Sequence, residues 1–292
     1  MESGIREVED NVEATEAWNG PLYEVWIKYR DLVADGLREH GENAIRLTPP
    51  AVGDRVLDIG CGLGDTTTRL AEIVGENGSA HGVDVAERMI ETAIDEARER
   101  GAQNVTFAAQ DVETEPFDRE FDYAFARFGT MFFANPVAAL RNVRQALAPS
   151  GVLNIVVWRR KLDNDMMHRA ELVVAEYLEE PEESDVPKCG PGPFSMANAD
   201  TVTDVLVHAG FGEIRLARQD LSYRIGNDLD QAVEFNMDLG PAAEVLRAWG
   251  DRIDEIRPKI VADLRTALGD FVQEDGSVVA PASTWAISAR PA

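Results

Sequence analysis

Short apolar runs alternate with longer amphipathic segments between about residues 55 and 158. The runs are bounded by Gly, Pro and acidic residues, which is typical of buried strands, while the segments between them have helical periodicity. The pattern predicts strands over 55–59, 80–84, 104–108, 121–126 and 152–158, and helices over 66–74, 86–100 and 136–147. This alternation predicts an α/β fold, with a parallel sheet and helices on both faces.

The flanking regions continue the pattern less regularly. Residues 13–47 have helical patterning with aromatic residues at Trp18, Tyr23, Trp26 and Tyr29, and Pro49-Pro50 separates them from the first strand. A further helix is predicted over 199–209, and further strands over 213–223 and 284–289. The resulting division is an N-terminal helical cap (1–48), a core (49–158), a cap insertion (159–197), more core (198–226), a second insertion (227–275) and a last core strand (276–292).

Both insertions leave from the carboxyl ends of strands, which is where open parallel sheets bind their ligands. We therefore expect them, with the N-terminal helices, to cover a small substrate. Trp18 and Trp26 could then cover the cofactor, although packing of the helix against the core is the favoured interpretation for them. The alternative for the insertions is that they extend the core or form the contact of a homodimer, since extra helices must bury an apolar face somewhere.

The most informative motif is the turn after the first strand, Asp58-Ile59-Gly60-Cys61-Gly62-Leu63-Gly64-Asp65. Glycines at alternate positions between a strand and a helix let the backbone approach a ligand where a side chain would clash. Asp84 ends the next predicted strand, and an acid at that place can accept both hydroxyls of a ribose. A lone glycine-rich turn has little meaning, but strand, helix and spaced acid together predict a nucleotide-type cofactor.

Two details select the cofactor. The third glycine comes one residue early for a dinucleotide fingerprint, and Asp65 occupies the place where that fingerprint has Gly or Ala. An acid at the helix N-terminus suits the helix dipole but opposes a phosphate. The turn therefore fits a ligand with a ribose and no phosphate, such as S-adenosylmethionine, and disfavours a nicotinamide oxidoreductase.

At these residues the chain resembles class I S-adenosylmethionine-dependent methyltransferases, in the small-molecule branch that includes quinone-biosynthesis enzymes. Residues 58–64 look like their first motif, Asp84 like their ribose-binding acid, 108–112 like their adenine-contacting segment, 121–127 like their fourth strand and 147–153 like the turn into their fifth. The resemblance covers about residues 50–160 and returns near the C-terminus. Ser150, where Gly is common, is a mild departure.

The resemblance implies a Rossmann-like, doubly wound, mostly parallel seven-stranded sheet with an antiparallel C-terminal strand and helical cap insertions. It also implies a set of residues that contact S-adenosylmethionine. They are Asp58, Gly60, Cys61, Gly62, Gly64, Asp84, Val85, Met89, Gln110, Asp111, Val112 and Arg127. Arg127 could bind the cofactor carboxylate, an anionic substrate, or an acidic side chain at the surface.

Composition narrows the partners. The formal charge of −25, from 28 basic and 53 acidic residues, disfavours nucleic acid, whose binding needs clustered cations. No apolar stretch is long enough to span a membrane, and the N-terminus has no apolar signal segment. Cys61 and Cys189 provide no disulfide framework. We therefore expect a cytoplasmic protein with a small-molecule substrate.

The chemistry constrains the catalytic residues less than it constrains the cofactor-binding residues, because methyl transfer needs a base only when the acceptor arrives protonated. His168 follows the fifth strand and is the candidate base, with a solvent-facing helix residue as the competing interpretation. Asp163 and Asp165 more often cap a helix than bind a metal, so no metal site is expected. The apolar cluster Phe128, Met131, Phe132 and Phe133 would line an acceptor pocket or pack in the core.

The sequence thus predicts methyl transfer to a small organic acceptor, at oxygen or carbon, by in-line displacement in a capped site. The alternative is a catalytically idle protein that binds S-adenosylmethionine as a sensor or assembly factor.

Overall fold

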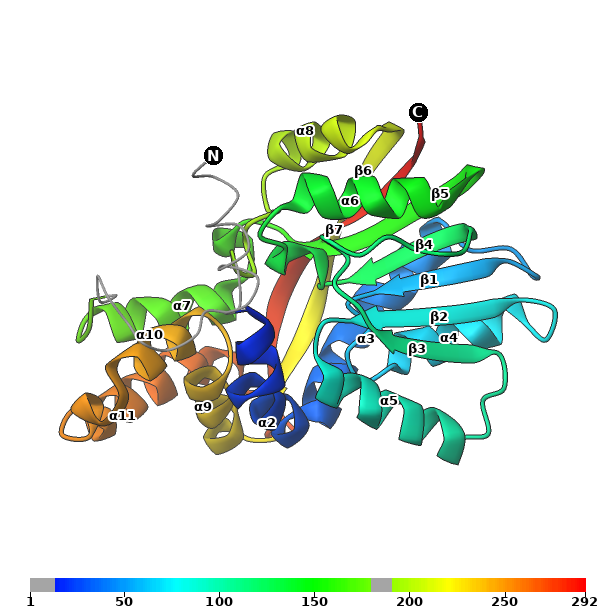
Figure 1. The fold of residues 1–292 in the computed structure, drawn as a ribbon. Coiled ribbons are helices and arrows are strands. Elements are labelled where there is room, and N and C mark those ends of the chain that lie inside the picture. The colour runs from blue at the N-terminus through cyan, green and yellow to red at the C-terminus, as the bar shows by residue number, and fades with distance from the viewer. Residues whose placement is uncertain (1–13, 180–190) are drawn as a thin grey trace.

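The computed structural model describes residues 14–179 and 191–292 of the chain, and its centre is a seven-stranded sheet (Figure 1). The strands are β1 (Arg55–Ile59), β2 (Ser79–Asp84), β3 (Val105–Ala109), β4 (Phe121–Arg127), β5 (Leu147–Trp158), β6 (Phe211–Gly226) and β7 (Val278–Pro291). They are arranged in the order β3-β2-β1-β4-β5-β7-β6. Strands β1 to β5 are mutually parallel, and β7 is antiparallel to both of its neighbours. The predicted fold class, including the antiparallel last strand, is confirmed.

Helices cover both faces of this sheet. The chain forms α2 (Pro21–Lys28), α3 (Arg30–Leu47), α4 (Asp65–Val74), α5 (Glu87–Glu99), α6 (Pro136–Ala146), α7 (Asp165–Ala175), α8 (Ala199–Ala209), α9 (Leu229–Asp238), α10 (Pro241–Trp249) and α11 (Arg257–Leu268). Short 3-10 turns lie at Thr130–Phe132, Lys161–Asp163, Gly250–Ile253 and Gly269–Phe271. The right-handed crossovers β1–α4–β2 and β2–α5–β3 progress to one edge, so α4 and α5 share a face with α3, whereas α6 and α8 pack on the other.

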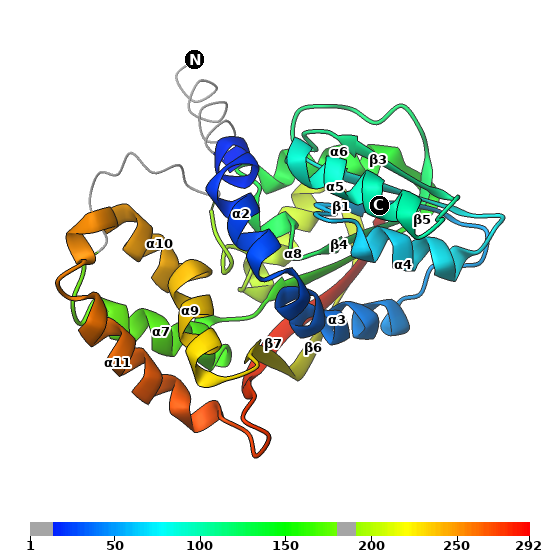
Figure 2. The same ribbon diagram turned by 90° about the horizontal axis from the view of Figure 1, so that it is seen from below.

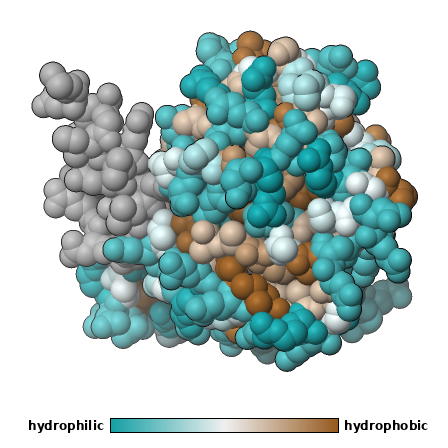
Figure 3. Space-filling model, turned by 45° about the vertical axis from the view of Figure 1, so that its right-hand side comes forward, coloured by the Kyte–Doolittle hydropathy of each residue, from teal (hydrophilic) through white to brown (hydrophobic). Residues whose placement is uncertain are grey.

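The sheet interior is mostly apolar. Leu57, Ile59, Phe125 and Ile155 have no solvent exposure, because parallel strands covered on both faces must be apolar in both directions. The surface is different in character. On the face seen in Figure 3 hydrophilic residues predominate around a smaller hydrophobic patch, in keeping with the acidic composition. None of the helices in the described ranges has the length and apolar character that crossing a membrane requires.

Some strands are longer than predicted. β5 begins at Leu147 instead of 152, because Leu147 pairs with Phe121 ahead of a register shift at the Pro-Ser-Gly turn. β6 and β7 extend beyond 213–223 and 284–289 because they form one long antiparallel pair, in which each strand satisfies the backbone of the other.

A second group of helices lies beside the sheet. Helices α7, α9, α10 and α11 pack on one another, and in both ribbon views α2 lies between this group and the parallel strands (Figure 2). The division of the chain into core and caps stays a prediction. Residues 1–13 of the predicted N-terminal cap and 180–190 of the first insertion, with Cys189, lie outside the described residues.

Candidate functional site

The glycine turn lies at the carboxyl edge of the sheet, between β1 and α4. The backbone N–H groups of Gly60 and Cys61 donate to the Val83 carbonyl oxygen at 2.8 and 3.0 Å, which fixes the turn to β2. Gly62 has φ +53°, a left-handed conformation that a side chain strains. A Cβ atom at Gly62 would nevertheless find its nearest neighbour, the Met89 sulfur, at 3.7 Å. The turn therefore presents bare backbone to open space.

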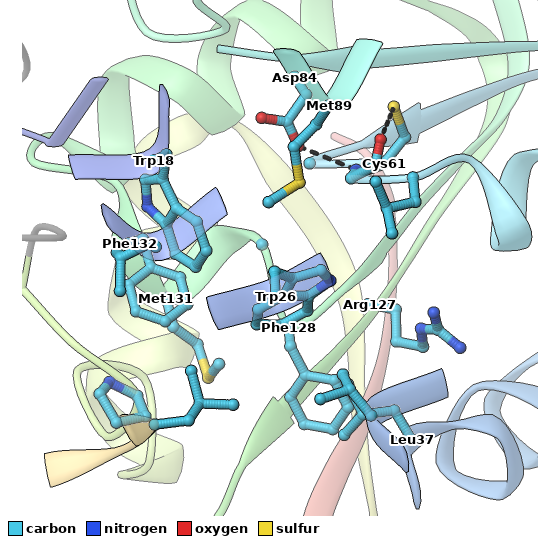
Figure 4. A pocket seen from close by; sticks show the side chains of 18 of the residues that line it. Trp18, Trp26, Leu37, Cys61, Asp84, Met89, Arg127, Phe128, Met131 and Phe132 are labelled. Atoms are coloured by element: carbon cyan, nitrogen blue, oxygen red, sulfur yellow. Dashed lines mark hydrogen bonds between the residues drawn. The ribbon is translucent and has the colours of Figure 1, made fainter. Parts of the chain in front are cut away.

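Asp84 braces this turn from the end of β2. One carboxylate oxygen accepts the Gly62 N–H at 2.9 Å, and the other accepts the Ala86 N–H at the same distance (Figure 4). Burial raises the pKa of Asp84, whereas these backbone donors lower it. Each oxygen has a further lone pair, and the residue lines a cavity, so the carboxylate can accept hydroxyl groups as well.

Asp58 lies beneath the turn and is more deeply buried. Its side chain is 1% exposed, and it accepts the Thr67 hydroxyl proton at 2.6 Å. Burial raises its pKa to about 7, against the opposing effects of the Thr67 hydrogen bond and of Arg127. The ionised form of Asp58 is therefore disfavoured, and a cationic group bound nearby would favour that ionised form.

Most of the predicted cofactor residues meet in one cavity. Those that line it are Asp58, Gly60, Cys61, Gly62, Asp84, Val85, Met89, Gln110, Asp111, Val112 and Arg127. Asp111 is partly engaged already, because its two oxygens accept the Glu113 N–H and the Thr114 hydroxyl at 2.9 and 2.7 Å.

Gly64 is not among these lining residues. It caps α4 with φ +80°, and a Cβ atom there would lie 2.8 Å from the Phe107 ring. The structure thus gives Gly64 a role in packing the turn against its neighbours, where the sequence predicted cofactor contact.

The other half of the cavity is aromatic. Trp18 makes edge-to-face contacts with Trp26 and Phe132, at ring-centroid distances of 5.7 and 5.3 Å, and Met131 lies beside them (Figure 4). Phe128 and Phe133 line the same space, so the whole predicted apolar cluster faces the cavity. Both helical insertions contribute lining residues as well. These are Met166, Met167 and Pro193 from the first, and Phe235, Asn236, Leu239, Gly240, Glu244 and Arg247 from the second.

Helix α2 is attached to α5 by polar contacts. The Tyr23 hydroxyl lies 3.0 Å from the Thr92 hydroxyl, and the Arg88 guanidinium stacks over the Tyr23 ring at 3.8 Å and pairs with Glu24 at 2.8 Å. These contacts hold Trp18 and Trp26, which lie on the same segment, over the glycine turn.

Arg127 ends β4 and lines the cavity. Within residues 14–179 and 191–292 its guanidinium has neither a hydrogen bond nor an ion pair, so the predicted alternative of a surface ion pair is not found there. Burial lowers the pKa of Arg127, although nearby Asp58 and Asp65 oppose the shift. An unpaired cation at this place favours an anionic ligand group.

His168 lies apart from the cavity. Its neighbours Met166 and Met167 on α7 line the space instead, and the His168 Nδ1 atom is buried without a hydrogen-bond partner. The structure therefore offers no support for His168 as a base that touches substrate. None of the other three histidines, which all fall in the described residues, lines the cavity either.

The sequence suggested that Asp163 and Asp165 cap a helix. In the structure they form ion pairs instead. Asp163 binds Arg159 and Arg160, and Asp165 binds Arg169, at 2.9–3.0 Å. Among the described residues no group of His, Cys, Asp and Glu is arranged to hold a metal ion.

Trp158 and Tyr223 are among the cavity residues that sequence reasoning missed. Trp158 ends β5, and Tyr223 lies close to the end of β6; their rings meet at a centroid distance of 6.1 Å. The available signal was their position, since each was predicted to end a strand at the ligand-binding edge.

Comparison with known proteins agrees with this geometry. Residues 51–187 match a family model described as a methyltransferase domain. Aklanonic acid methyltransferase DauC from Streptomyces sp. strain C5 is 39% identical over 112 residues, which are 38% of this chain and 51% of that protein. The ubiquinone/menaquinone biosynthesis C-methyltransferase UbiE from Azotobacter vinelandii is 34% identical over 129 residues, 43% and 51% of the two chains. The chain thus spans about half the length of the curated relatives it matches.

Solved structures extend the likeness over most of the chain. The YcgJ protein of Bacillus subtilis superposes with a TM-score of 0.56 at 19% identity, over 87% of this chain and 98% of that one. The [4+2]-cyclase SpnF gives 0.50 at 23% identity, over 87% and 80%. These likenesses concern the fold. The sheet order and the glycine turn agree with the match of residues 51–187 to a methyltransferase domain.

Proposed function

We propose that the protein transfers the methyl group of S-adenosylmethionine to a small aromatic acceptor, at oxygen or carbon. The observation that carries this proposal is a single cavity with two unlike halves. One half has the glycine turn with Asp84 and Asp111, and the other has the aromatic residues around Trp18 and Phe132. The relatives are named for quinone-like or aklanonic acid substrates, and an aromatic cavity suits acceptors of that kind.

The cofactor would lie along the carboxyl edge of β1, β2 and β4. Its ribose hydroxyls would be accepted by Asp84, its adenine would lie beside Gln110, Asp111 and Val112, and its carboxylate would be bound by Arg127. Gly60 and Gly62 would contact it through the backbone. Asp58, whose ionised form is disfavoured, would gain from the positive charge that the cofactor brings.

In this arrangement the protein contributes position and a dry site. Methyl transfer is an in-line displacement, so catalysis depends on aligning the acceptor atom with the methyl group and excluding water. Trp18, Trp26 and the lining residues of α7, α9 and α10 would enclose the acceptor on the side opposite the sheet.

The test measures binding and turnover separately. We expect S-adenosylhomocysteine to bind in calorimetry while NAD does not, and labelled S-adenosylmethionine to methylate members of a panel of hydroxylated naphthoquinones and anthraquinones. NAD binding without S-adenosylhomocysteine binding would overturn the cofactor assignment. Tight S-adenosylhomocysteine binding with no turnover on any aromatic acceptor would favour the idle sensor or assembly factor.

Three further expectations belong with this proposal. A cytoplasmic location and a homodimer both stay predictions, as does the expectation that the acidic chain binds no nucleic acid.

A further inference from the structure

Two hydrogen-bond donors in the aromatic half of the cavity have no partner among the described residues. The Tyr223 hydroxyl and the Trp158 indole N–H take part in no hydrogen bond within the described residues, although the two residues are only 3% and 7% exposed. Neither atom is among the wholly buried side-chain atoms that lack a partner. Because both residues line the cavity, we infer that both atoms border its open space.

Such donors are unusual in a folded protein. A buried polar group without a partner costs about 1–3 kcal/mol, so most are satisfied by the protein or by ordered water. The other described tyrosines follow this rule: the Tyr29 hydroxyl donates to Asp238 at 2.8 Å, and Tyr123 donates to the Thr48 carbonyl oxygen at 2.6 Å. Because the Tyr223 hydroxyl borders open space, a ligand or an ordered water in the cavity would supply the missing acceptor.

The fold makes room for this side chain at a cost to helix α3. Gly36 is in the interior of α3, and a Cβ atom there would lie 2.6–2.9 Å from Tyr223 ring atoms. Glycine in a helix interior is less favourable than alanine by about 1 kcal/mol. Its presence is explained by the close approach of the helix to the Tyr223 ring, which Trp158 and Phe235 hold from other sides.

The cavity also lacks an imidazole base, since no histidine lines it. An acidic phenol or enol acceptor needs no imidazole, because such a hydroxyl loses its proton unaided near neutral pH. Tyr223 and Trp158 are donors toward such an oxygen, and burial raises the pKa of Tyr223, so its hydroxyl keeps its proton.

We propose that the acceptor carries an acidic phenol or enol hydroxyl and binds as its oxyanion, with the Tyr223 hydroxyl and the Trp158 N–H donating to the charged oxygen. This inference rests on the proposed methyl transfer and names its substrate class. The acceptor proton leaves to solvent before the reaction. The acceptor oxygen then forms a bond to the methyl carbon, the methyl–sulfur bond breaks, and its electron pair stays on sulfur.

The test reads the ionisation state of a bound probe. 4-Nitrophenol and 4-nitro-1-naphthol absorb visible light strongly only as phenolates, so a titration with the protein and S-adenosylhomocysteine shows which form binds. We expect the phenolate to bind preferentially, with the apparent pKa of the bound probe below its value in water. The non-ionising ether 4-nitroanisole should bind more weakly.

Variants localise the effect. Tyr223→Phe keeps the ring and removes the hydroxyl, so it should weaken phenolate binding by about ten- to a hundredfold and return the probe pKa toward its free value. Trp158→Phe should act in the same direction. The matched control is Tyr177→Phe, whose hydroxyl binds Asp263 away from the cavity and whose loss should change neither quantity.

The inference is overturned if neither probe binds as the phenolate, or if Tyr223→Phe binds both probes as the wild type does. Calorimetry with S-adenosylhomocysteine separates this result from the proposed function. If S-adenosylhomocysteine does not bind the wild-type protein, the methyltransferase proposal is wrong. The probe titration would still show whether the cavity binds an oxyanion.

Discussion

Gly36 lies so close to Tyr223 that the effect of Gly36→Ala on the free energy of unfolding should depend on the side chain at position 223. In an open helix, Gly→Ala stabilises by about 1 kcal/mol. Here the new Cβ atom would lie 2.6 Å from Tyr223 Cε2 and 2.7 Å from Cζ, well inside van der Waals contact. Overpacking of this kind costs about 1–3 kcal/mol. We expect Gly36→Ala to lower the free energy of unfolding by about 1 kcal/mol, because the ring is held by its neighbours and cannot withdraw.

The same substitution should have the opposite effect when the ring is removed. Tyr223→Ala removes all the ring atoms that collide, so Gly36→Ala in that background should raise the free energy of unfolding by up to about 1 kcal/mol. The coupling between the two sites would then be about 2 kcal/mol, within the range for residues in contact. Urea denaturation of the four proteins measures this cycle. Equal effects of Gly36→Ala in both backgrounds would refute the argument.

Four further predictions concern the site. Asp84→Asn should weaken S-adenosylhomocysteine binding by about ten- to a hundredfold in calorimetry, and unchanged affinity in a folded variant would contradict the ribose assignment. Gly62→Ala should reduce that affinity more than it reduces thermal stability, because space is present but the φ of +53° is strained; early melting with normal binding would indicate a purely structural turn. Burial raises the pKa of Asp58 to about 7, so its contribution to the free energy of unfolding is complete below about pH 4 and is lost as the pH rises to 7. Asp58→Asn should remove this decline, which urea midpoints measured between pH 4 and 8 would show. His168→Ala should leave turnover nearly unchanged, since His168 does not line the cavity, and a hundredfold loss with intact cofactor affinity would make it the base after all.

Much of the core was predictable because local rules and the fold agree there. The strand of Val56, Leu57 and Ile59 is a short apolar run, interrupted only by Asp58, that a glycine ends, and this pattern is typical of a buried strand. The glycine turn and Asp84, in the cofactor half of the cavity, were predictable for the same reason, because their separation along the sequence identifies them.

The acceptor half could not be derived in this way. Tyr223 meets Trp158 only through the pairing of β6 and β5 with β7, which no local pattern encodes. The orientation of His168 could not be predicted because successive helix residues point about 100° apart, so the face of α7 that meets the cavity depends on tertiary packing. Met166 and Met167 occupy that face.

The placement of the cavity residues along the chain has an evolutionary consequence. The segment that matches the methyltransferase family, residues 51–187, contains the glycine turn and Asp84, whereas Trp18, Trp26 and Tyr223 lie outside it. Under the proposed function, the donor site would lie within the matched segment, whereas recognition of the acceptor would be divided between that segment, through Phe132 and Trp158, and the flanking elements. Changes in α2 and β6 would then alter the acceptor while the donor site is preserved, and a chimaera that exchanges these elements with those of a relative should change substrate preference.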